Sequence, residues 1–135
     1  MIMHLKPILN TSLPQQFRQI RLELAREPAH PEGDSDFGYI IIAPLAPDGR
    51  IDHESWKKHR EACRVTRLRP DENSDIGHLI HRPGGTWAFH YDDATNLPDE
   101  AGYHFADERF VAGEYVSIKE GDTMHTYRVR SVARL

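Results

Sequence analysis

The sequence contains a single cysteine, Cys63, and no long apolar run. One thiol cannot form an internal disulfide, and a chain of 135 residues is long enough to build a core without one. The longest apolar run, residues 39–43, is followed by Pro44 and falls far short of the roughly 20 residues that a transmembrane helix needs. The first 14 residues also lack the continuous apolar core and cleavage site of a signal peptide. We therefore expect one unprocessed, cytoplasmic domain that does not span a membrane.

Several motifs of catalysis and cofactor binding are also missing. The chain has no GxSxG turn, no HExxH pair and no paired CxxC. The Gly84-Gly85 pair is not followed by a helix with the Lys-Ser or Lys-Thr of a phosphate loop, so it is typical of a turn. The sequence therefore predicts no cofactor, and enzymatic activity stays open.

Charge is unevenly distributed along the chain, although the net charge is only -4. Residues 50–70 hold 7 basic and 3 acidic groups, whereas residues 71–108 hold 1 basic and 9 acidic groups. The basic block coincides with a predicted helix from Asp52 to about Cys63, where Asp52 is suited to cap the first turn. Apart from Arg50, which precedes the helix, the basic side chains of this block are Lys57, Lys58, Arg60, Arg64, Arg67 and Arg69.

Alternating apolar and polar residues predict most of the remaining elements. Strands are expected at 19–26, 37–43 and 65–68, followed by two hairpins over 76–91 and 115–129. We expect a mainly β (α+β) fold: a curved antiparallel sheet or a partly open small barrel of about six or seven strands, with one helix. Residues 1–15 are expected to form a loosely ordered arm and 16–135 a single domain. Residues 92–108 are expected to form a long acidic loop.

The turn of the first hairpin fixes which of its residues face each other. A two-residue turn would need a positive φ at Pro83, which the proline ring forbids, so we expect a three-residue loop. Pro83 and Gly84 would form the middle of a type I turn, and Gly85 would take the left-handed position. Counting outward, His78 then faces His90.

This register divides the hairpin into two faces. Leu79, Trp87, Phe89 and Tyr91 share a face that we expect to be core, and we expect Trp87 to be buried. The opposite face collects the candidate ligand-binding residues His78, Arg82, His90 and Asp92. Two facing imidazoles could share a metal or a proton, and with Arg82 they could bind an anion. The alternative is that they are solvated side chains on the wet face of the sheet.

Three segments carry a resemblance to other proteins: HRPGGTWAFHYD, GRIDHESWKKHREAC and AGYHFADERFVAGEYVSIKEGDTMHTYRV. In these segments the chain resembles a small family of uncharacterised bacterial proteins, and the similarity covers most of residues 18–132. The resemblance implies an intact domain, and it implies no activity, cofactor or catalytic residue.

Three hypotheses for function follow from these patterns. The preferred hypothesis is a small-ligand-binding or regulatory domain without enzymatic activity, whose partner is a small anionic ligand and which holds no metal. The first alternative is a metal-assisted hydrolase that uses His78, His90 and Asp92, with a further ligand from elsewhere in the chain. The second is single-stranded nucleic-acid binding through the basic helix 53–69, with Trp87, Phe89 and Tyr91 stacking on bases. The acidic flanking stretch makes nucleic acid the less favoured partner.

Overall fold

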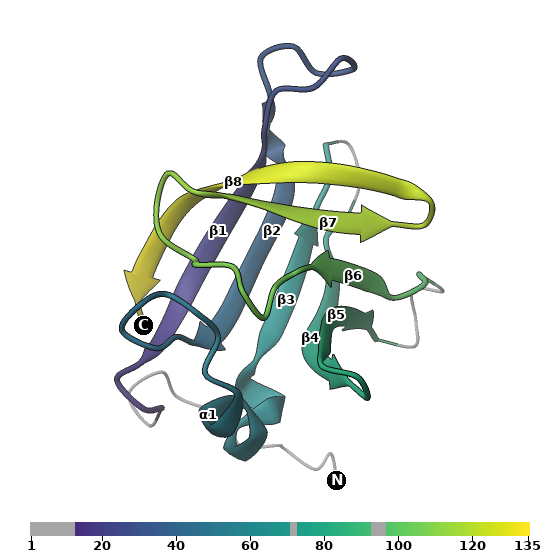
Figure 1. Cartoon of the computed structure of the whole chain (residues 1–135). Coiled ribbons are helices and arrows are strands. Elements are labelled where there is room, and N and C mark those ends of the chain that lie inside the picture. Colours follow the sequence, from purple (N-terminus) through teal and green to yellow (C-terminus); the bar gives the residue numbers. More distant parts are fainter. Residues whose placement is uncertain (1–12, 71–72, 93–96) are drawn as a thin grey trace, which may run out of the picture.

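A computed structural model describes residues 13–70, 73–92 and 97–135, and these residues form a closed barrel of antiparallel strands (Figure 1). Each strand pairs with the next along the chain, and the eighth pairs with the first. The strands are β1 (Phe17–Leu24), β2 (Asp34–Pro44), β3 (Arg64–Leu68), β4 (Asp75–Arg82), β5 (Thr86–Tyr91), β6 (Glu100–Tyr103), β7 (Tyr115–Glu120) and β8 (Thr123–Arg134). No helix in these ranges is long and apolar enough to cross a membrane.

The mainly β class and the single helical region are confirmed, and the barrel is closed by eight strands. The expected long loop at 92–108 contains an unpredicted strand, β6. This strand has four residues, begins with Glu100 and includes Gly102, so it lacks the apolar alternation that reveals a strand. Most of the expected arm at 1–15 lies outside the described residues.

Alternation along the strands places the core inside the barrel. On β1 the buried residues Ile20, Leu22 and Leu24 alternate with more exposed ones, as expected for one inward and one outward face. β8 is the longest strand and crosses the barrel from its hairpin with β7 to its pairing with β1 (Figure 1). The β1–β2 connection projects beyond the barrel at the top of this view, and α1 (His53–Lys58) covers the lower end.

The expected helix from Asp52 to Cys63 is divided in two. α1 ends at Lys58, and a single 3-10 turn, η2 (Arg60–Ala62), follows it. His59 separates them, because its backbone angles of φ -134 and ψ 40 are not helical. Asp52 caps α1 as predicted, accepting a hydrogen bond of 3.2 Å from the Ser55 amide.

The register predicted for the β4–β5 hairpin, its three-residue loop and the positive φ of Gly85 are confirmed, but the type I geometry expected at Gly84 is wrong. His78 pairs with His90, and Arg82 pairs with Thr86. Gly84 has a φ of +94° and Gly85 has a φ of +87°, whereas a type I turn would give Gly84 a negative φ. Both positions therefore use the left-handed backbone that glycine adopts without strain.

Candidate functional site

The residues predicted to form a site lie together on the outer face of β4 and β5, in two ion-paired groups. His78 Nδ1 lies 3.7 Å from Asp92 Oδ1. His90 Nδ1 lies 2.7 Å and Arg82 Nη2 lies 2.5 Å from the carboxylate of Asp99, a residue that the sequence interpretation did not include. His90 is more than half exposed, so this outer cluster (His78, Arg82, His90, Asp92 and Asp99) is open to solvent.

The charge that would bind an anion in the outer cluster is already neutralised by the protein itself. Burial alone would raise the pKa of Asp99, but hydrogen bonds from His90 and Arg82 lower it below the usual value for aspartate. Within the described part of the chain, no three histidine, cysteine, aspartate or glutamate side chains lie close enough to hold a metal ion. An added anion would have to displace the Asp99 carboxylate from Arg82.

The three aromatic residues and two of the six basic residues expected to bind nucleic acid point into the barrel, and the other four basic residues are exposed: Lys57, Lys58, Arg60 and Arg64. Trp87 is 3% exposed, as predicted for a core residue, and Phe89 and Tyr91 are also buried, so none is available for stacking on a base. Of the predicted basic surface, Arg67 and Arg69 point inward, with side chains 15% and 6% exposed.

Cys63 is fully buried, and burial raises the pKa of its thiol to about 12.

Arg67 and Arg69 belong to a polar network inside the barrel that sequence reasoning missed. Arg67 Nε donates to Glu100 Oε2 at 3.2 Å, and Arg69 Nη2 donates to Glu120 Oε1. Tyrosine hydroxyl groups complete the network by donating to the two glutamates: Tyr39, Tyr91 and Tyr127. Every fully buried side-chain nitrogen and oxygen in the described residues has a hydrogen-bond partner. The network is therefore satisfied without a ligand.

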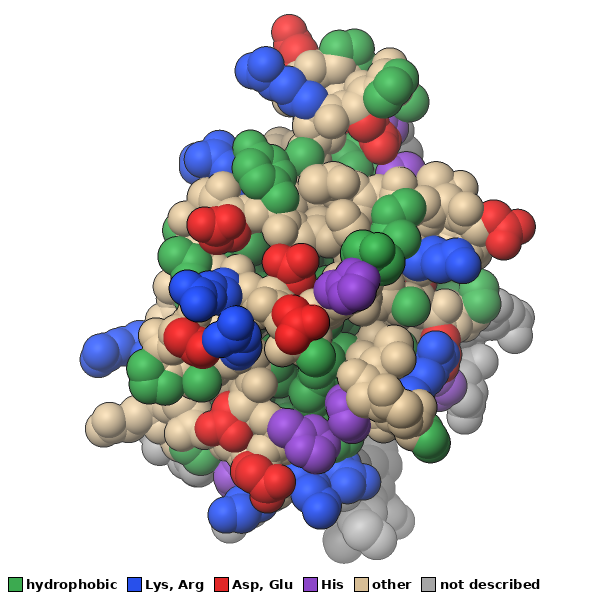
Figure 2. Space-filling model, viewed as in Figure 1, with side chains coloured by type: hydrophobic (Ala, Val, Ile, Leu, Met, Phe, Trp, Pro, Cys, Tyr) green, Lys and Arg blue, Asp and Glu red, His purple; other side chains and the backbone are tan. Residues whose placement is uncertain are grey.

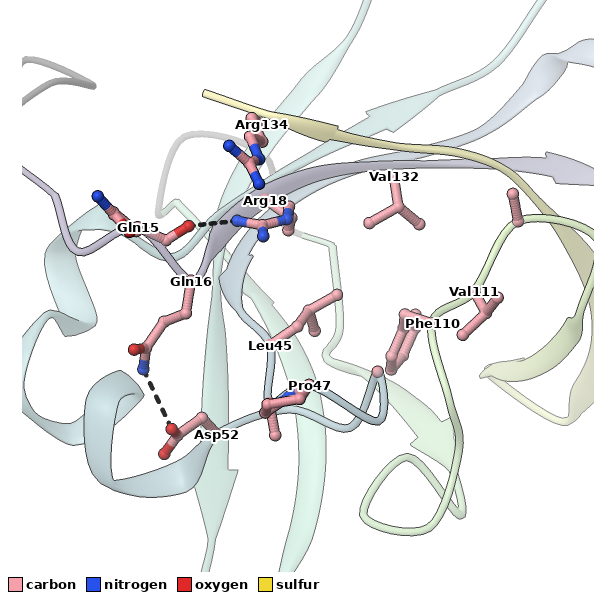
Figure 3. Close-up of a pocket in the computed structure, with 13 residues that line it drawn as sticks. Gln15, Gln16, Arg18, Leu45, Pro47, Asp52, Phe110, Val111, Val132 and Arg134 are labelled. Atoms are coloured by element: carbon pink, nitrogen blue, oxygen red, sulfur yellow. Dashed lines mark hydrogen bonds between the residues drawn. The ribbon is translucent and has the colours of Figure 1, made fainter.

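A cleft of about 690 Å³ lies at one end of the barrel (Figure 3). We call it the end cleft. It is bounded by the start of β1, the end of β8, the connection from β2 to α1 and the segment at 110–112. Its residues are Gln15, Gln16, Arg18, Leu45, Ala46, Pro47, Gly49, Asp52, Phe110, Val111, Ala112, Val132 and Arg134. The volume lies within the roughly 300 to 1,000 Å³ of typical small-ligand sites.

Backbone contacts hold the apolar wall of the end cleft in place. The Phe110 amide donates to the Gly49 carbonyl at 2.8 Å, which ties the 109–113 segment to the β2–α1 connection. Gly49 has a φ of +91°, and a Cβ there would lie 2.9 Å from the Val111 side chain, so this close approach requires glycine. Leu45 and Phe110 are buried, whereas Val111 is 47% exposed. The wall is preformed and partly open to solvent.

Two arginines, Arg18 and Arg134, lie opposite each other at the edge of the end cleft. They are paired residues on the adjacent strands β1 and β8, and Figure 3 shows both side chains at this edge of the cleft. Arg18 follows the alternation of Ile20 and Leu22, which places it on the inner face at the end of the barrel. Its guanidinium donates to the backbone carbonyls of Phe17 and Gln15, and neither arginine forms an ion pair with any residue in the described ranges.

The remaining charge in the end cleft, that of Asp52, is held by other groups. Asp52 accepts from the Ser55 amide at 3.2 Å and from Gln16 Nε2 at 3.1 Å. The two arginines therefore form a concentration of positive charge that the described residues do not neutralise. The sequence interpretation missed it because Arg18 precedes the predicted first strand at 19–26 and Arg134 lies beyond the predicted end of the last hairpin at residue 129.

Comparisons of the chain with protein-family models, with curated proteins and with solved structures find no match. The functional argument therefore rests on the geometry described above.

Proposed function

We propose that this protein binds a small molecule with an apolar body and an anionic group in the end cleft. The observation that carries the proposal is the pairing of Arg18 with Arg134 at the edge of a preformed hollow. Like charges directly opposite each other on neighbouring strands destabilise a sheet. An anion between the two guanidinium groups would remove this repulsion and would receive charge-assisted hydrogen bonds from both.

The apolar wall supports the same class of ligand. Leu45, Phe110 and Val132 line the cleft beside the arginines, and Val111 adds exposed apolar surface at the rim. Burying this surface under a ligand would be favourable at roughly 25 cal/mol per Å². A carboxylate, sulfonate or phosphate attached to a hydrocarbon or aromatic body fits both halves of the cleft, whereas a small inorganic anion would use only one of them.

Two fluorescent probes that differ mainly in charge test this proposal. Anilinonaphthalene sulfonate has an apolar body and an anionic group, and N-phenyl-naphthylamine has a similar body without the charge. We expect Arg18→Gln and Arg134→Gln each to weaken binding of the sulfonate about tenfold. A hydrogen bond to a charged group is worth about 1.5 to 3 kcal/mol. Binding of the neutral probe should change little.

Arg130→Gln is the matched control, because Arg130 lies on β8 with its side chain 60% exposed and does not line the end cleft. It should leave both affinities unchanged. If Arg130→Gln weakened binding of the sulfonate probe as much as the cleft variants do, the probe would be responding only to the net charge of the protein. Unchanged sulfonate binding in both cleft variants would remove the end cleft as the anion site.

A further inference from the structure

Two glutamates of the interior network face each other across neighbouring strands. Ala101 on β6 pairs with Lys119 on β7, and extending this register by one residue places Glu100 opposite Glu120. Opposite residues on an antiparallel pair have Cβ atoms about 4.5 to 5.5 Å apart. Their side chains are 5% and 11% exposed, so little water separates the two carboxyl groups.

Arg67 contacts both carboxyl groups and so lies between them, with its guanidinium 3.2 Å from Glu100 Oε2 and 3.4 Å from Glu120 Oε1. An ionised carboxylate can only accept hydrogen bonds, so a bond between two carboxyl groups requires a proton on one of them. Two buried carboxylates in contact would also repel each other in a medium of low dielectric constant. The geometry therefore favours one proton held between the pair.

The surrounding charges assign that proton to Glu100. Arg69 donates to Glu120, whereas Arg67 contacts both carboxyl groups. Burial raises the pKa of Glu100. The Tyr91 hydroxyl and Arg67 lower it and the charge of Glu120 raises it, so that the net shift of this pKa is upward. Burial also acts to raise the pKa of Glu120, but Arg69 and the Tyr127 hydroxyl reverse this and lower it. Glu120 is thus the ionised member of the pair.

We propose that Glu100 and Glu120 share one proton at neutral pH, carried by Glu100, and that this proton is a pH-sensitive latch between β6 and β7. While the proton is present, the two carboxyl groups bond across the strands; once it is lost, they repel each other. Titratable and charged groups from the other packed strands also face the pair: Tyr39 on β2, Arg67 on β3, Arg69 directly after β3, Asp75 on β4, Tyr91 on β5, and His125 and Tyr127 on β8. Glu27, on the β1–β2 connection, contacts His125.

The direction of the pH dependence follows from the two shifts. The pKa of Glu100 is raised above 4.5, so the folded protein binds this proton more tightly than the unfolded chain does. The stabilisation that this proton provides is complete below pH 4.5, and it is lost as the pH rises through the pKa that Glu100 has in the folded protein. The pKa of Glu120 is lowered, so its contribution is present above pH 4.5 and is lost in acid. The contact between Glu100 and Glu120 across β6 and β7 therefore weakens as the pH becomes alkaline.

Infrared spectroscopy of the full chain carrying carbon-13-labelled glutamate tests the proposal directly. At neutral pH we expect the folded wild-type protein to show the C=O band of one protonated glutamate. This band should fade as the pH is raised while the protein is still folded. Glu100→Gln should remove the band and flatten the fall in stability with rising pH. Glu54→Gln, at a residue 79% exposed, should leave the band intact.

Absence of the band from the wild-type protein at neutral pH would overturn the proposal, and so would its full persistence in Glu100→Gln. The wild-type titration decides the question even if that variant fails to fold. The result is independent of ligand binding in the end cleft, because none of the groups in the latch lines that cleft.

Discussion

Two pairs of arginines, one inside the barrel and one at its end, differ in their surroundings. Arg67 on β3 and Arg69, the residue after β3, are met by Glu100, Glu120 and tyrosine hydroxyl groups. Arg18 and Arg134 at the end cleft meet each other and have no ion pair within the described ranges. The first pair holds strands together, because Arg69 pairs with Glu120 and Arg67 contacts both Glu120 and Asp75. The second pair contributes repulsion instead, which is the pattern expected of a site that an anionic ligand completes.

The outer cluster on β4 and β5 is intermediate between these two cases. Arg82 is paired with Asp99, but both side chains are partly exposed to water. An exposed ion pair contributes about 0 to 1 kcal/mol. In Figure 2, acidic and basic side chains are interspersed over the face shown, which is consistent with charges that are screened locally. Position in the barrel therefore predicts what each arginine contributes to stability.

Removing an arginine from the interior network should have the largest effect. Arg69→Met deletes the partner of Glu120, the contact with the Phe37 ring at 3.7 Å and the bond to the Leu68 carbonyl at 2.7 Å. Breaking a buried ion pair by removing one partner costs about 3 to 5 kcal/mol. We expect chemical denaturation to show a loss of stability in this range. A loss below about 1 kcal/mol would mean that the interior arginines are no better paired than those of the end cleft.

Asp99→Asn in the outer cluster should have a smaller effect that depends on pH. The pKa of Asp99 is lowered from 3.8, so its ion pairs stabilise the protein above that pH and are lost as the pH falls. At neutral pH the variant should lose less than about 1 kcal/mol. In strong acid the wild type and the variant should be equally stable, provided both are still folded. A difference that persists undiminished in acid would show that Asp99 acts by packing rather than by charge.

Arg134→Leu at the end cleft should have the smallest effect on stability. The change removes the repulsion with Arg18 and adds apolar surface beside Val132. We expect the free energy of unfolding to be unchanged or higher by up to about 0.5 kcal/mol, since exposed substitutions usually fall in that range. A loss of more than about 1 kcal/mol in thermal or chemical unfolding would show that Arg134 has a structural partner.

The register of the first hairpin could be predicted because its loop length and apolar alternation agree. The pairing of His78 with His90 is confirmed, and the second predicted hairpin, over 115–129, is present as β7 and β8. The exact turn could not be predicted at Gly84, because glycine fits both a negative and a positive φ. Closure into a barrel could not be predicted either, since it depends on pairing between β1 and β8 at opposite ends of the chain.

The end cleft and the interior network were hidden from sequence reasoning for a common reason. Arg18 and Arg67 each stand two residues from a buried apolar residue, Ile20 and Val65, and so occupy positions that point inward. The prediction starts the first strand after Arg18, and it counts Arg67 as part of a basic surface although Arg67 lies within the predicted strand 65–68, because charged side chains are usually exposed. The alternation of inward-facing residues continues through these arginines instead of stopping at them. Following that alternation through a charged residue would have located both sites.

The central claim is that the anion site is the end cleft, and nuclear magnetic resonance with labelled protein tests it most directly. On titration with anilinonaphthalene sulfonate, we predict the largest saturable shifts at Arg18, Leu45, Phe110 and Arg134, including the guanidinium signals of the two arginines. The interior residues Glu100 and Tyr127 should shift little. Largest shifts at Arg82, His90 and Asp99 instead, with the end cleft unaffected, would contradict the account and place the anion on the outer face of β4 and β5.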